Sequence, residues 1–243
     1  MALKSTLKRL LSYGPYRVAR GAGNRFDAMG DCLRGLARRT FAPSLIIDVG
    51  AFRGTFALMA NKVFPAAAIH MVEPQPMCTP DLRQLSNRPG FFFYPVAVTS
   101  RTRPVRMIVK SGADTGAHIA WAANQDEANL EVRGTTLDEL FNDRCGLGER
   151  ILLKLDLQGH ELLALEGAPQ LLPKVEAVLL EVSFFQQVGE PTIPKIVAFF
   201  DVAGFDLYDV GALAGRTRDG RLRQGDFVFV RRTSPLWLDR SWA

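Results

Sequence analysis

From residue 44 onward, short apolar runs alternate with segments of helical pattern, and this alternation constrains the fold more than any other feature. Residues 45–49 are β-branched, apolar on both faces and followed by a glycine, as expected of a buried strand. Strands of this kind that alternate with helices are typical of βαβ units. The sequence therefore predicts an α/β fold with a mostly parallel sheet.

The same pattern gives approximate boundaries for the other elements. Further strands are predicted at residues 69–72, 92–98, 105–109, 151–155 and 178–182, with a closing pair at 205–210 and 227–231. Helices are predicted at residues 54–63, 161–166 and 193–203. Pro95 indicates an edge position or a bend in the third strand. We expect residues 105–109 to extend the sheet, residues 111–131 to be an insertion over the site, and residues 211–226 to form a loop.

The composition is that of an ordinary globular chain. With 47% hydrophobic and 23% charged residues, the sequence excludes disordered, collagen-like and coiled-coil classes. Cys32, Cys78 and Cys145 are far apart and form no Cys-x-x-Cys pair. This argues against a disulfide framework or a structural zinc and favours a reducing compartment, so we expect a cytoplasmic protein.

The amino-terminal segment carries the basic charge of the chain. Residues 1–40 hold nine Lys or Arg against two acidic residues, whereas the remainder is slightly acidic. Lys and Arg interrupt every apolar run there, and no window reaches the roughly 20 apolar residues of a membrane span, so neither a signal nor a span is expected. We interpret residues 1–40 as a basic helical arm and residues 41–243 as the main domain. The arm either contacts an anionic membrane surface, substrate or nucleic acid, or packs on the domain as an amphipathic helix.

Glycines and acidic residues follow the first two predicted strands, at the edge where open α/β sheets bind ligands. Gly50 comes two residues after Asp48 and permits a tight turn and the close approach of a ligand. Gly54 lets the next helix begin near the sheet, with free N–H groups facing the cleft. Glu73 ends the second strand 25 residues after Asp48, where it can accept hydrogen bonds from two ribose hydroxyls. Together these residues predict an adenosine site.

The spacing within the first turn narrows the choice of cofactor. The segment Gly50-Ala51-Phe52-Arg53-Gly54 lacks the middle glycine of G-x-G-x-x-G, and the chain has no P-loop motif. Asp48 would repel a pyrophosphate, yet it could pair, directly or through water, with the ammonium of a methionine moiety. The sequence therefore favours S-adenosylmethionine.

A series of motifs within residues 40–210 resembles the FkbM family of S-adenosylmethionine-dependent methyltransferases. In chain order these are Asp48-Val49-Gly50-Ala51 with Gly54, Glu73-Pro74, Thr136-Leu137-Asp138, Lys154-Leu155-Asp156-Leu157-Gln158-Gly159-His160-Glu161 with Leu165, Glu166-Gly167-Ala168, and Glu181. The K-x-D-x-Q-G-x-E block is the most specific of them, whereas the first motif alone indicates only a class I methyltransferase. The third strand departs from the pattern, because it ends at Ala97 and Val98 without the acidic residue often found there.

The resemblance implies a doubly wound, Rossmann-like sheet of seven strands with an antiparallel last strand. It also implies transfer of a methyl group to a hydroxyl, since known acceptors in the family include macrolide hydroxyls and the sugar hydroxyls of glycans or lipo-oligosaccharides. Together with the turn described above, it makes the expected cofactor contacts Asp48, Gly50, Ala51, Gly54, Glu73 and Ala97.

The cofactor already carries an activated methyl group, so the protein must mainly align the hydroxyl and remove its proton. Transfer to an aliphatic hydroxyl therefore needs a base. Asp156 follows one predicted strand, His160 begins the next helix and Glu181 ends the next strand, so the three should converge on the acceptor side. His160 is our first choice as base, since imidazole titrates near neutral pH, while Asp156 would orient it, bind an acceptor hydroxyl or hold a cation. The sequence does not separate these roles. The spacing of these residues fixes no metal site, and none is predicted.

Other polar residues have structural interpretations. Lys154 alternates with apolar residues in a central strand and is expected to be a buried ion-pair partner. Glu161 is expected to stabilise the amino terminus of its helix, and His70 to be structural. His118, in the irregular segment, either lies on the surface or reaches the substrate. Four arginines of the closing loop are either solvated or meet an anionic acceptor; they are Arg216, Arg218, Arg221 and Arg223.

These features predict an O-methyltransferase acting on a sugar hydroxyl of a glycan or glycolipid precursor. The basic arm and the arginine-rich loop suit an amphiphilic or anionic acceptor, so a location peripheral to the inner face of a membrane is expected. A macrolide or another small secondary metabolite is the alternative acceptor. Nucleic acid is less favoured, because the chain has neither an N/D-P-P-[YF] motif nor a basic face interleaved with aromatic residues. Asp156, His160 and Glu181 argue against a cofactor-binding protein without activity.

Overall fold

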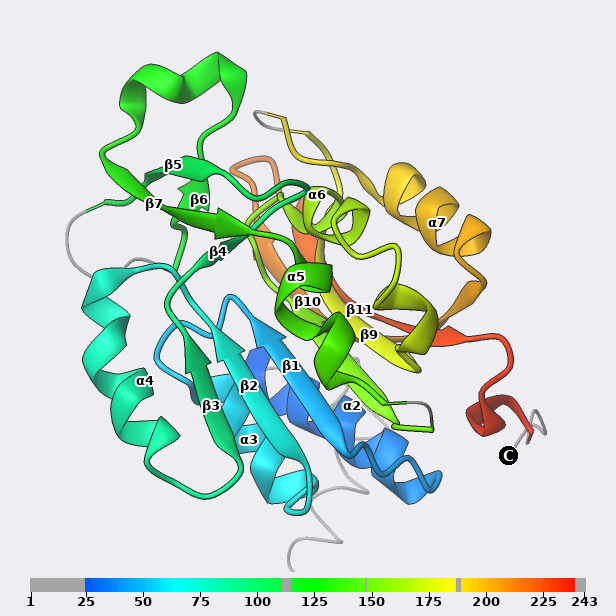
Figure 1. Cartoon of the computed structure of the whole chain (residues 1–243). Helices are drawn as coiled ribbons and strands as arrows, with labels where there is room; N and C mark the ends of the chain where they lie inside the picture. The colour runs from blue at the N-terminus through cyan, green and yellow to red at the C-terminus, as the bar shows by residue number, and fades with distance from the viewer. Residues whose placement is uncertain (1–24, 111–114, 147, 187–188, 239–243) are drawn as a thin grey trace, which may run out of the picture.

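The computed structural model describes residues 25–110, 115–146, 148–186 and 189–238 of the chain. Its centre is a seven-stranded sheet of strand order β3-β2-β1-β8-β9-β11-β10 (Figure 1). Neighbouring strands are parallel except around β11, which runs antiparallel to both β9 and β10. The strands are β1 (Leu45–Val49), β2 (Ala68–Val72), β3 (Phe91–Tyr94), β8 (Ile151–Leu155), β9 (Ala177–Ser183), β10 (Phe205–Arg216) and β11 (Leu222–Arg231). The predicted α/β sheet with an antiparallel last strand is confirmed.

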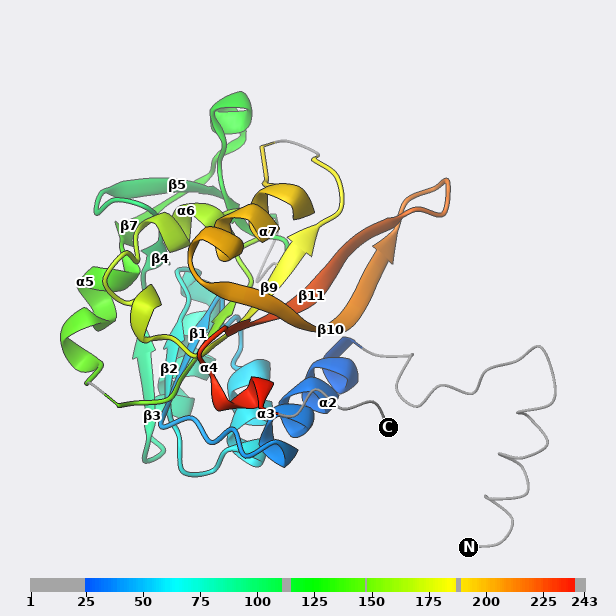
Figure 2. The ribbon, with the colours of Figure 1, turned by 90° about the vertical axis from the view of Figure 1, so that its right-hand side faces the viewer.

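Helices cover both faces of this sheet. Successive side chains of a strand point to opposite faces, so Ile46 of β1 packs into one buried cluster and Ile47 into the other. Three helices cover each face (Figure 2). On the Ile47 face these are α5 (Leu137–Phe141), α6 (Glu161–Glu166) and α7 (Ile193–Val202); on the Ile46 face they are α2 (Arg25–Arg38), α3 (Thr55–Val63) and α4 (Thr79–Ser86). Because both faces are inside, the central strands are mostly apolar, with a few buried polar residues such as Asp48 and Lys154.

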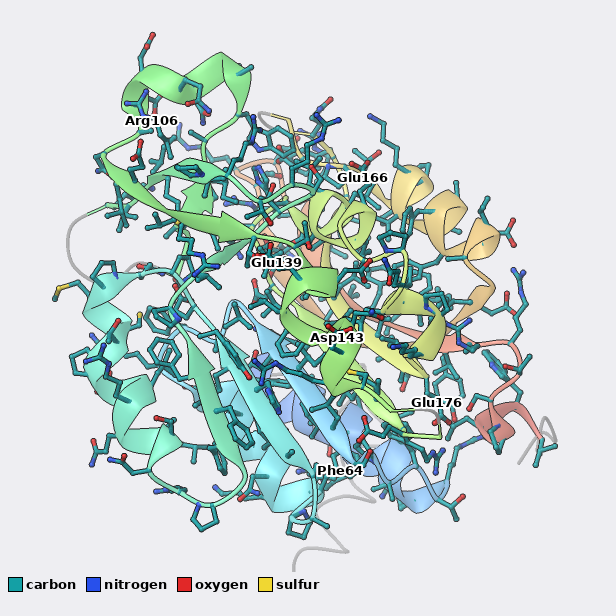
Figure 3. The ribbon with its side chains drawn as sticks, in the orientation of Figure 1. Phe64, Arg106, Glu139, Asp143, Glu166 and Glu176 are labelled. Atoms are coloured by element: carbon teal, nitrogen blue, oxygen red, sulfur yellow. The ribbon has the colours of Figure 1, made fainter. Side chains whose placement is uncertain are left out.

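A smaller four-stranded sheet lies across the carboxyl-end edge of the main sheet. Its strands, in the order β4-β7-β5-β6, are β4 (Ala97–Val98), β7 (Leu130–Thr135), β5 (Pro104–Ile108) and β6 (His118–Ile119). Arg106 on β5 and Phe64, just after α3, mark opposite ends of the molecule in Figure 3. The small sheet therefore covers the edge of the main sheet where the parallel strands end.

Two strand predictions are wrong in this region. Residues 92–98 do not form one strand: β3 ends at Tyr94, and Ala97 pairs with Gly134 of β7 in the small sheet. Pro95 lies between the two segments and has no N–H to continue a ladder. The strand predicted at residues 105–109 is present as β5, but it does not extend the main sheet, because β5 pairs with β6 and β7 instead.

The closing hairpin is longer than predicted. Strands β10 and β11 remain paired as far as Arg216 and Leu222, so residues 211–226 are mostly strand rather than loop. The connection is residues 217–221, and Thr217 accepts and donates hydrogen bonds across it with Arg221. Figure 2 shows the tip of this hairpin extending away from the rest of the structure. The glycines of this segment misled the prediction, because Gly211 lies at an irregularity of the ladder and Gly225 pairs regularly with Leu213, both within the strands.

The part of the predicted arm that the structure describes is the helix α2. Met29, Leu33 and Leu36 are buried, and α2 packs on α3 and β10. Residues 1–24 lie outside the described residues, and so does most of the basic charge of the arm. None of the described helices is both long enough and apolar enough to cross a membrane.

Several short helical turns complete the chain. They are η1 (Pro76–Cys78), η2 (Ala122–Glu127), η3 (Asn142–Arg144), η4 (Leu172–Lys174) and η5 (Pro235–Trp237). The helices predicted at residues 54–63, 161–166 and 193–203 are confirmed as α3, α6 and α7 to within a residue at each end. Helices α4 and α5 and strand β7 were not predicted.

Candidate functional site

The strand order reverses between β1 and β8, which are neighbours although the chain makes β2 and β3 between them. Ligands of open α/β sheets bind at the carboxyl ends of the strands at such a switch point. A cavity of about 560 Å³ lies there, between the loops that follow β1, β2 and β8 and the small sheet above them. This volume falls in the range of about 300–1,000 Å³ that is usual for small-molecule sites.

The loop after β1 depends on a glycine. Gly50 has a φ of +75°, and a Cβ at this position would lie 2.0 Å from the Asp156 carbonyl oxygen. Lys154 Nζ donates to the Gly50 carbonyl oxygen at 2.7 Å. Two residues later, the Phe52 N–H donates to Glu73 Oε2 at 2.9 Å. The turn is therefore held by β8 on one side and by the end of β2 on the other.

Gly54 has a packing role. It precedes α3 with a φ of +81°, and a Cβ there would lie 2.2 Å from Leu85 Cδ1 of α4. Gly54 itself does not line the cavity, whereas Ala51 and Thr55 on either side of it do. It thus lets α3 begin close to α4 and brings the start of that helix to the cavity.

Asp48 does not reach the cavity wall. Its carboxylate is wholly buried and lies 3.0 Å from Lys154 Nζ. The two residues are register partners on neighbouring strands, so their side chains share one face of the sheet. Burial raises the pKa of the Asp48 carboxyl, and the Lys154 ammonium opposes that shift. Lys154 is the buried ion-pair partner that the sequence predicted, and Asp48 is linked to the turn through it.

Glu73 lies at the cavity wall with an oriented carboxylate. Its Oε1 accepts from the Gln75 N–H and its Oε2 from the Phe52 N–H, both at 2.9 Å. Burial raises the pKa of this carboxyl, and the two backbone bonds oppose the shift. Each carboxylate oxygen has a further lone pair, so Glu73 can also accept hydrogen bonds from hydroxyls of a ligand.

The residues of this half of the cavity fit a nucleoside sulfonium. Gly50 leaves space at the backbone that a side chain would fill, and Glu73 supplies an acceptor for hydroxyl groups. Ala51 and Ala97 line the same cavity with small side chains, and each is 3% exposed. Of the six expected cofactor contacts, four line the cavity, and Asp48 and Gly54 lie behind them.

At the other half of the cavity an amide joins two carboxylates, one on the cavity wall and one behind it. Gln158 Nε2 donates to Asp156 Oδ1 at 2.9 Å and to Glu181 Oε2 at 2.8 Å. Gln224 Nε2 of β11 donates to Glu181 Oε1 at 2.6 Å. Asp156, Gln158 and Gln224 line the cavity, while Glu181 lies behind them and is 7% exposed. Asp156 and Glu181 converge as predicted, and Gln158 is what joins them.

His160 lines the same half of the cavity and is 3% exposed. Its ring lies 4.2 Å from that of Trp121, centroid to centroid, and its Nδ1 has no hydrogen-bond partner among the described residues. Burial, with a smaller effect from His118, lowers the pKa of His160 to about 4. The imidazole is therefore neutral at pH 7. Its Nδ1 does not bond to Asp156, so no contact through this nitrogen orients the ring towards that carboxylate among the described residues.

Glu161 and His70, which were expected to be structural, hold neighbouring parts of the fold in place. Glu161 Oε1 accepts from the N–H groups of Leu157 and Gly159, so it fixes the loop before its own helix. Burial raises the pKa of Glu161 to about 7. His70 stacks on Phe92, and its Nδ1 lies 2.9 Å from the hydroxyl oxygen of Tyr94. Of the two alternatives for His118, the structure favours a place near the substrate, because His118 lines the cavity from β6.

Several cavity residues were not singled out in the sequence. Trp121 comes from the segment 111–131 that was expected over the site, and Gln224 from the segment interpreted as a loop. Glu190 is buried on the cavity wall, where it packs against Gly159. Gln158 belongs to the K-x-D-x-Q-G-x-E block, and its role could have been predicted from the sequence. An amide that lies between two acids at strand ends can donate a hydrogen bond to each of them.

Of the four arginines at the closing hairpin, Arg223 lines the cavity. Arg216 donates to the Gly220 carbonyl oxygen, and Arg221 pairs with Asp219 at 2.7 Å. Across the described ranges, no three His, Cys, Asp or Glu side chains are grouped so that they could hold a metal ion.

Among solved structures, the chain is similar to three methyltransferases at low identity. The FkbM methyltransferase of Methylobacillus flagellatus KT shares 15% identity with a TM-score of 0.47 over 76% of this chain, which spans 43% of that protein's length. A precorrin-6y C5,15-methyltransferase of Geobacter metallireducens GS-15 shares 11% with a TM-score of 0.48, over 90% of this chain and 95% of that one. A 1,6-didemethyltoxoflavin-N1-methyltransferase of Burkholderia thailandensis, solved with S-adenosylhomocysteine, shares 13% with a TM-score of 0.42, over 94% and 87%. No curated protein matches the chain significantly.

The family assignment comes from the sequence model of the methyltransferase FkbM domain, which matches residues 48–207. This range begins at the acid before the glycine turn and includes Glu73, Asp156, His160 and Glu181. It therefore contains both halves of the cavity apart from the residues that α2 and β11 contribute. The chain belongs to the FkbM family of methyltransferases, which use S-adenosylmethionine.

Proposed function

We propose that this methyltransferase transfers a methyl group to a sugar hydroxyl of a glycan or lipo-oligosaccharide precursor. The observation that carries the proposal is the joined pair of carboxylates, Asp156 and Glu181, beside the neutral imidazole of His160. Carboxylates and amides complement a hydroxyl, which both donates and accepts hydrogen bonds. This half of the cavity is therefore suited to a ligand that carries several hydroxyls.

In this proposal the first half of the cavity holds the cofactor. Glu73 accepts hydrogen bonds from the ribose hydroxyls, and the turn at Gly50 admits the nucleoside close to the backbone. Lys154 keeps the turn in place through its bond to the Gly50 carbonyl oxygen. When bound, S-adenosylmethionine supplies an electrophilic methyl carbon, so the remaining task of the protein is to align a hydroxyl and remove its proton.

The proton acceptor in this proposal is His160. Its pKa of about 4 leaves the imidazole unprotonated across the neutral range, so every molecule can accept a proton, although the same shift makes it a weaker base than an ordinary histidine. Asp156 takes the role of binding the acceptor hydroxyl, because its bond to Gln158 holds it at the cavity wall. Enclosure of His160 by Trp121 limits water around the base.

In this proposal the acceptor lies in the cytoplasm, close to the inner face of a membrane. The support for this is the charge of residues 1–40, which suits an anionic surface, together with Arg223 at the cavity. A macrolide or another small hydroxylated metabolite would use the same residues. Nucleic acid is a weaker alternative, and it would require binding that falls steeply with salt.

The experiment is mass spectrometry of glycans from cells with and without the protein. We expect one methyl group, an increment of about 14 Da, to be lost from a hexose or deoxyhexose when the protein is missing. Purified protein with radiolabelled cofactor should then label the unmethylated glycan. Unchanged glycans together with a labelled metabolite or RNA would overturn the sugar proposal.

A further inference from the structure

We propose that Gln158 binds the acceptor, with its side-chain carbonyl oxygen accepting a hydrogen bond from a hydroxyl next to the one that is methylated. The acceptor class is then a vicinal diol. This inference rests on the proposed function, because it concerns how the same site recognises a sugar.

The orientation of the Gln158 amide follows from its neighbours. Its terminal amide atom nearest the acids lies 2.9 Å from Asp156 Oδ1 and 2.8 Å from Glu181 Oε2. Ionised carboxylates only accept hydrogen bonds, so this atom must be the NH₂ nitrogen and not the oxygen. Both protons of the NH₂ group are then used, one on each carboxylate. The carbonyl oxygen Oε1 consequently points away from the two acids.

The carbonyl oxygen has no donor within the described part of the chain. The hydrogen bonds of the Gln158 side chain are those of Nε2 to the two acids, and its side chain lines the cavity. Because Gln158 lines the cavity, a hydroxyl of a ligand there can reach Oε1 as a donor. Asp156 stands two residues earlier on the same wall, so a ligand with adjacent hydroxyls can meet both residues at once.

The backbone supports a role in binding over a role in folding. Gln158 has a φ of +51°, a left-handed conformation that costs stability for any residue with a side chain. A glycine would adopt it freely, as Gly159 does with a φ of +104°. A glycine, however, has no amide to join Asp156 to Glu181 or to face the cavity. The unfavourable backbone conformation thus occurs at the residue whose side chain bonds to both Asp156 and Glu181.

The test combines two variants with two forms of the acceptor. Gln158→Leu keeps the bulk of the side chain without its polar atoms, and Gln158→Gly removes the side chain and relieves the left-handed strain. Thr40→Gly is the matched control, since Thr40 has a φ of +63° and is exposed outside the cavity. Radiolabelled methyl transfer is measured with monosaccharide acceptors and with analogues that lack each neighbouring hydroxyl in turn. Affinity for S-adenosylhomocysteine is measured by calorimetry on every variant.

We expect the wild type to lose about five- to tenfold in kcat/KM when one particular neighbouring hydroxyl is removed. Both Gln158 variants should be slow with the complete sugar, yet show less than a twofold further loss with that analogue. A role limited to holding Asp156 would slow both acceptors equally and leave the analogue penalty intact. All three variants should bind S-adenosylhomocysteine within about twofold of the wild type.

An undiminished analogue penalty in both Gln158 variants would overturn this inference while leaving the proposed function in place. Loss of S-adenosylhomocysteine binding would overturn it too, because Gln158 would then support the cofactor. If the wild type methylates no sugar but binds S-adenosylhomocysteine, the proposed function fails, and the inference with it. That failure is visible in the wild type alone.

Discussion

Lys154 Nζ lies 3.0 Å from Asp48 Oδ1, and neither side chain is more than 6% exposed. The same ammonium donates to the carbonyl oxygens of Val49 at 3.3 Å and Gly50 at 2.7 Å. One buried cation therefore neutralises the acid of β1 and fixes the turn that follows it. This links the K-x-D block of β8 to the cofactor half of the cavity.

Lys154→Met should destabilise the protein and weaken its binding of the cofactor product. Removal of one partner leaves the Asp48 carboxylate buried without its cation, a change that costs about 3–5 kcal/mol. The Gly50 carbonyl oxygen also loses its donor, so we expect at least a tenfold weaker affinity for S-adenosylhomocysteine. Urea unfolding and calorimetry measure the two effects.

The double variant Asp48→Leu with Lys154→Met separates the effect on stability from the effect on affinity for S-adenosylhomocysteine. It should recover part of the stability, because no unpaired charge remains, but not the affinity. Lys174→Met is the control, since Lys174 bonds to Asn142 and to the Cys145 carbonyl oxygen away from the cavity. Normal affinity in Lys154→Met would contradict the link between this pair and the turn.

Gly50→Ala should abolish binding at the cofactor half. The new Cβ would lie 2.0 Å from the Asp156 carbonyl oxygen at a residue whose φ is +75°. Gly220→Ala is matched to it, because Gly220 has a φ of +85° but no atom within 4 Å of a new Cβ. We expect about 1–2 kcal/mol of destabilisation at Gly220 from the left-handed backbone, and clearly more at Gly50. Equal losses in thermal unfolding would show that contact with β8 is unimportant.

His160→Ala should lose methyl transfer while keeping cofactor affinity. A general base is worth about 10²–10⁴-fold, so we expect kcat to fall by at least 100-fold. His118→Ala, the other imidazole on the cavity wall, should lose less than tenfold. Because burial lowers the pKa of His160 to about 4, kcat/KM of the wild type should not decline between pH 8 and pH 6 through this group. Activity should be lost as the pH falls towards 4, and an acid limb near 6.5 would argue against His160 as the base.

Glu161→Gln should change how stability depends on pH. Burial raises the pKa of Glu161 to about 7 in the folded protein, against 4.5 for an ordinary Glu, so its contribution is present below pH 4.5 and lost as the pH rises through 7. The Gln oxygen can still accept from the N–H groups of Leu157 and Gly159 without ionising. Relative to the wild type, the variant should gain about 3 kcal/mol between pH 4.5 and pH 8.

The comparison for that measurement is Glu166→Gln at the other end of α6, where the carboxylate is exposed (Figure 3). Because this carboxylate stays in water in both states, unfolding of the control should follow the wild type from pH 4.5 to pH 8. A parallel response of the two variants would show that the Glu161 site is not responsible.

The sequence by itself determined the central strands of the main sheet, the glycine turn and the block that carries Asp156 and His160. These features depend on residues close together in the chain: β-branched runs make buried strands, and only glycine tolerates the backbone at Gly50. The same local reasoning placed Glu73 at the end of its strand. It also paired Asp156 with Glu181, since Asp156 follows β8 and Glu181 lies near the carboxyl end of the neighbouring parallel strand β9.

Only the tertiary structure decided which atoms meet. The register of β1 against β8 places Lys154 beside Asp48. Asp48 therefore does not face the cavity, and it acts on the turn through its ion pair with Lys154. The small sheet could not be foreseen, because its strands pair across residues 97–135 that carry no regular period. Gln224 reaches Glu181 only because β11 inserts antiparallel beside β9. Such contacts depend on the pairing of distant strands, which local residue preferences do not encode.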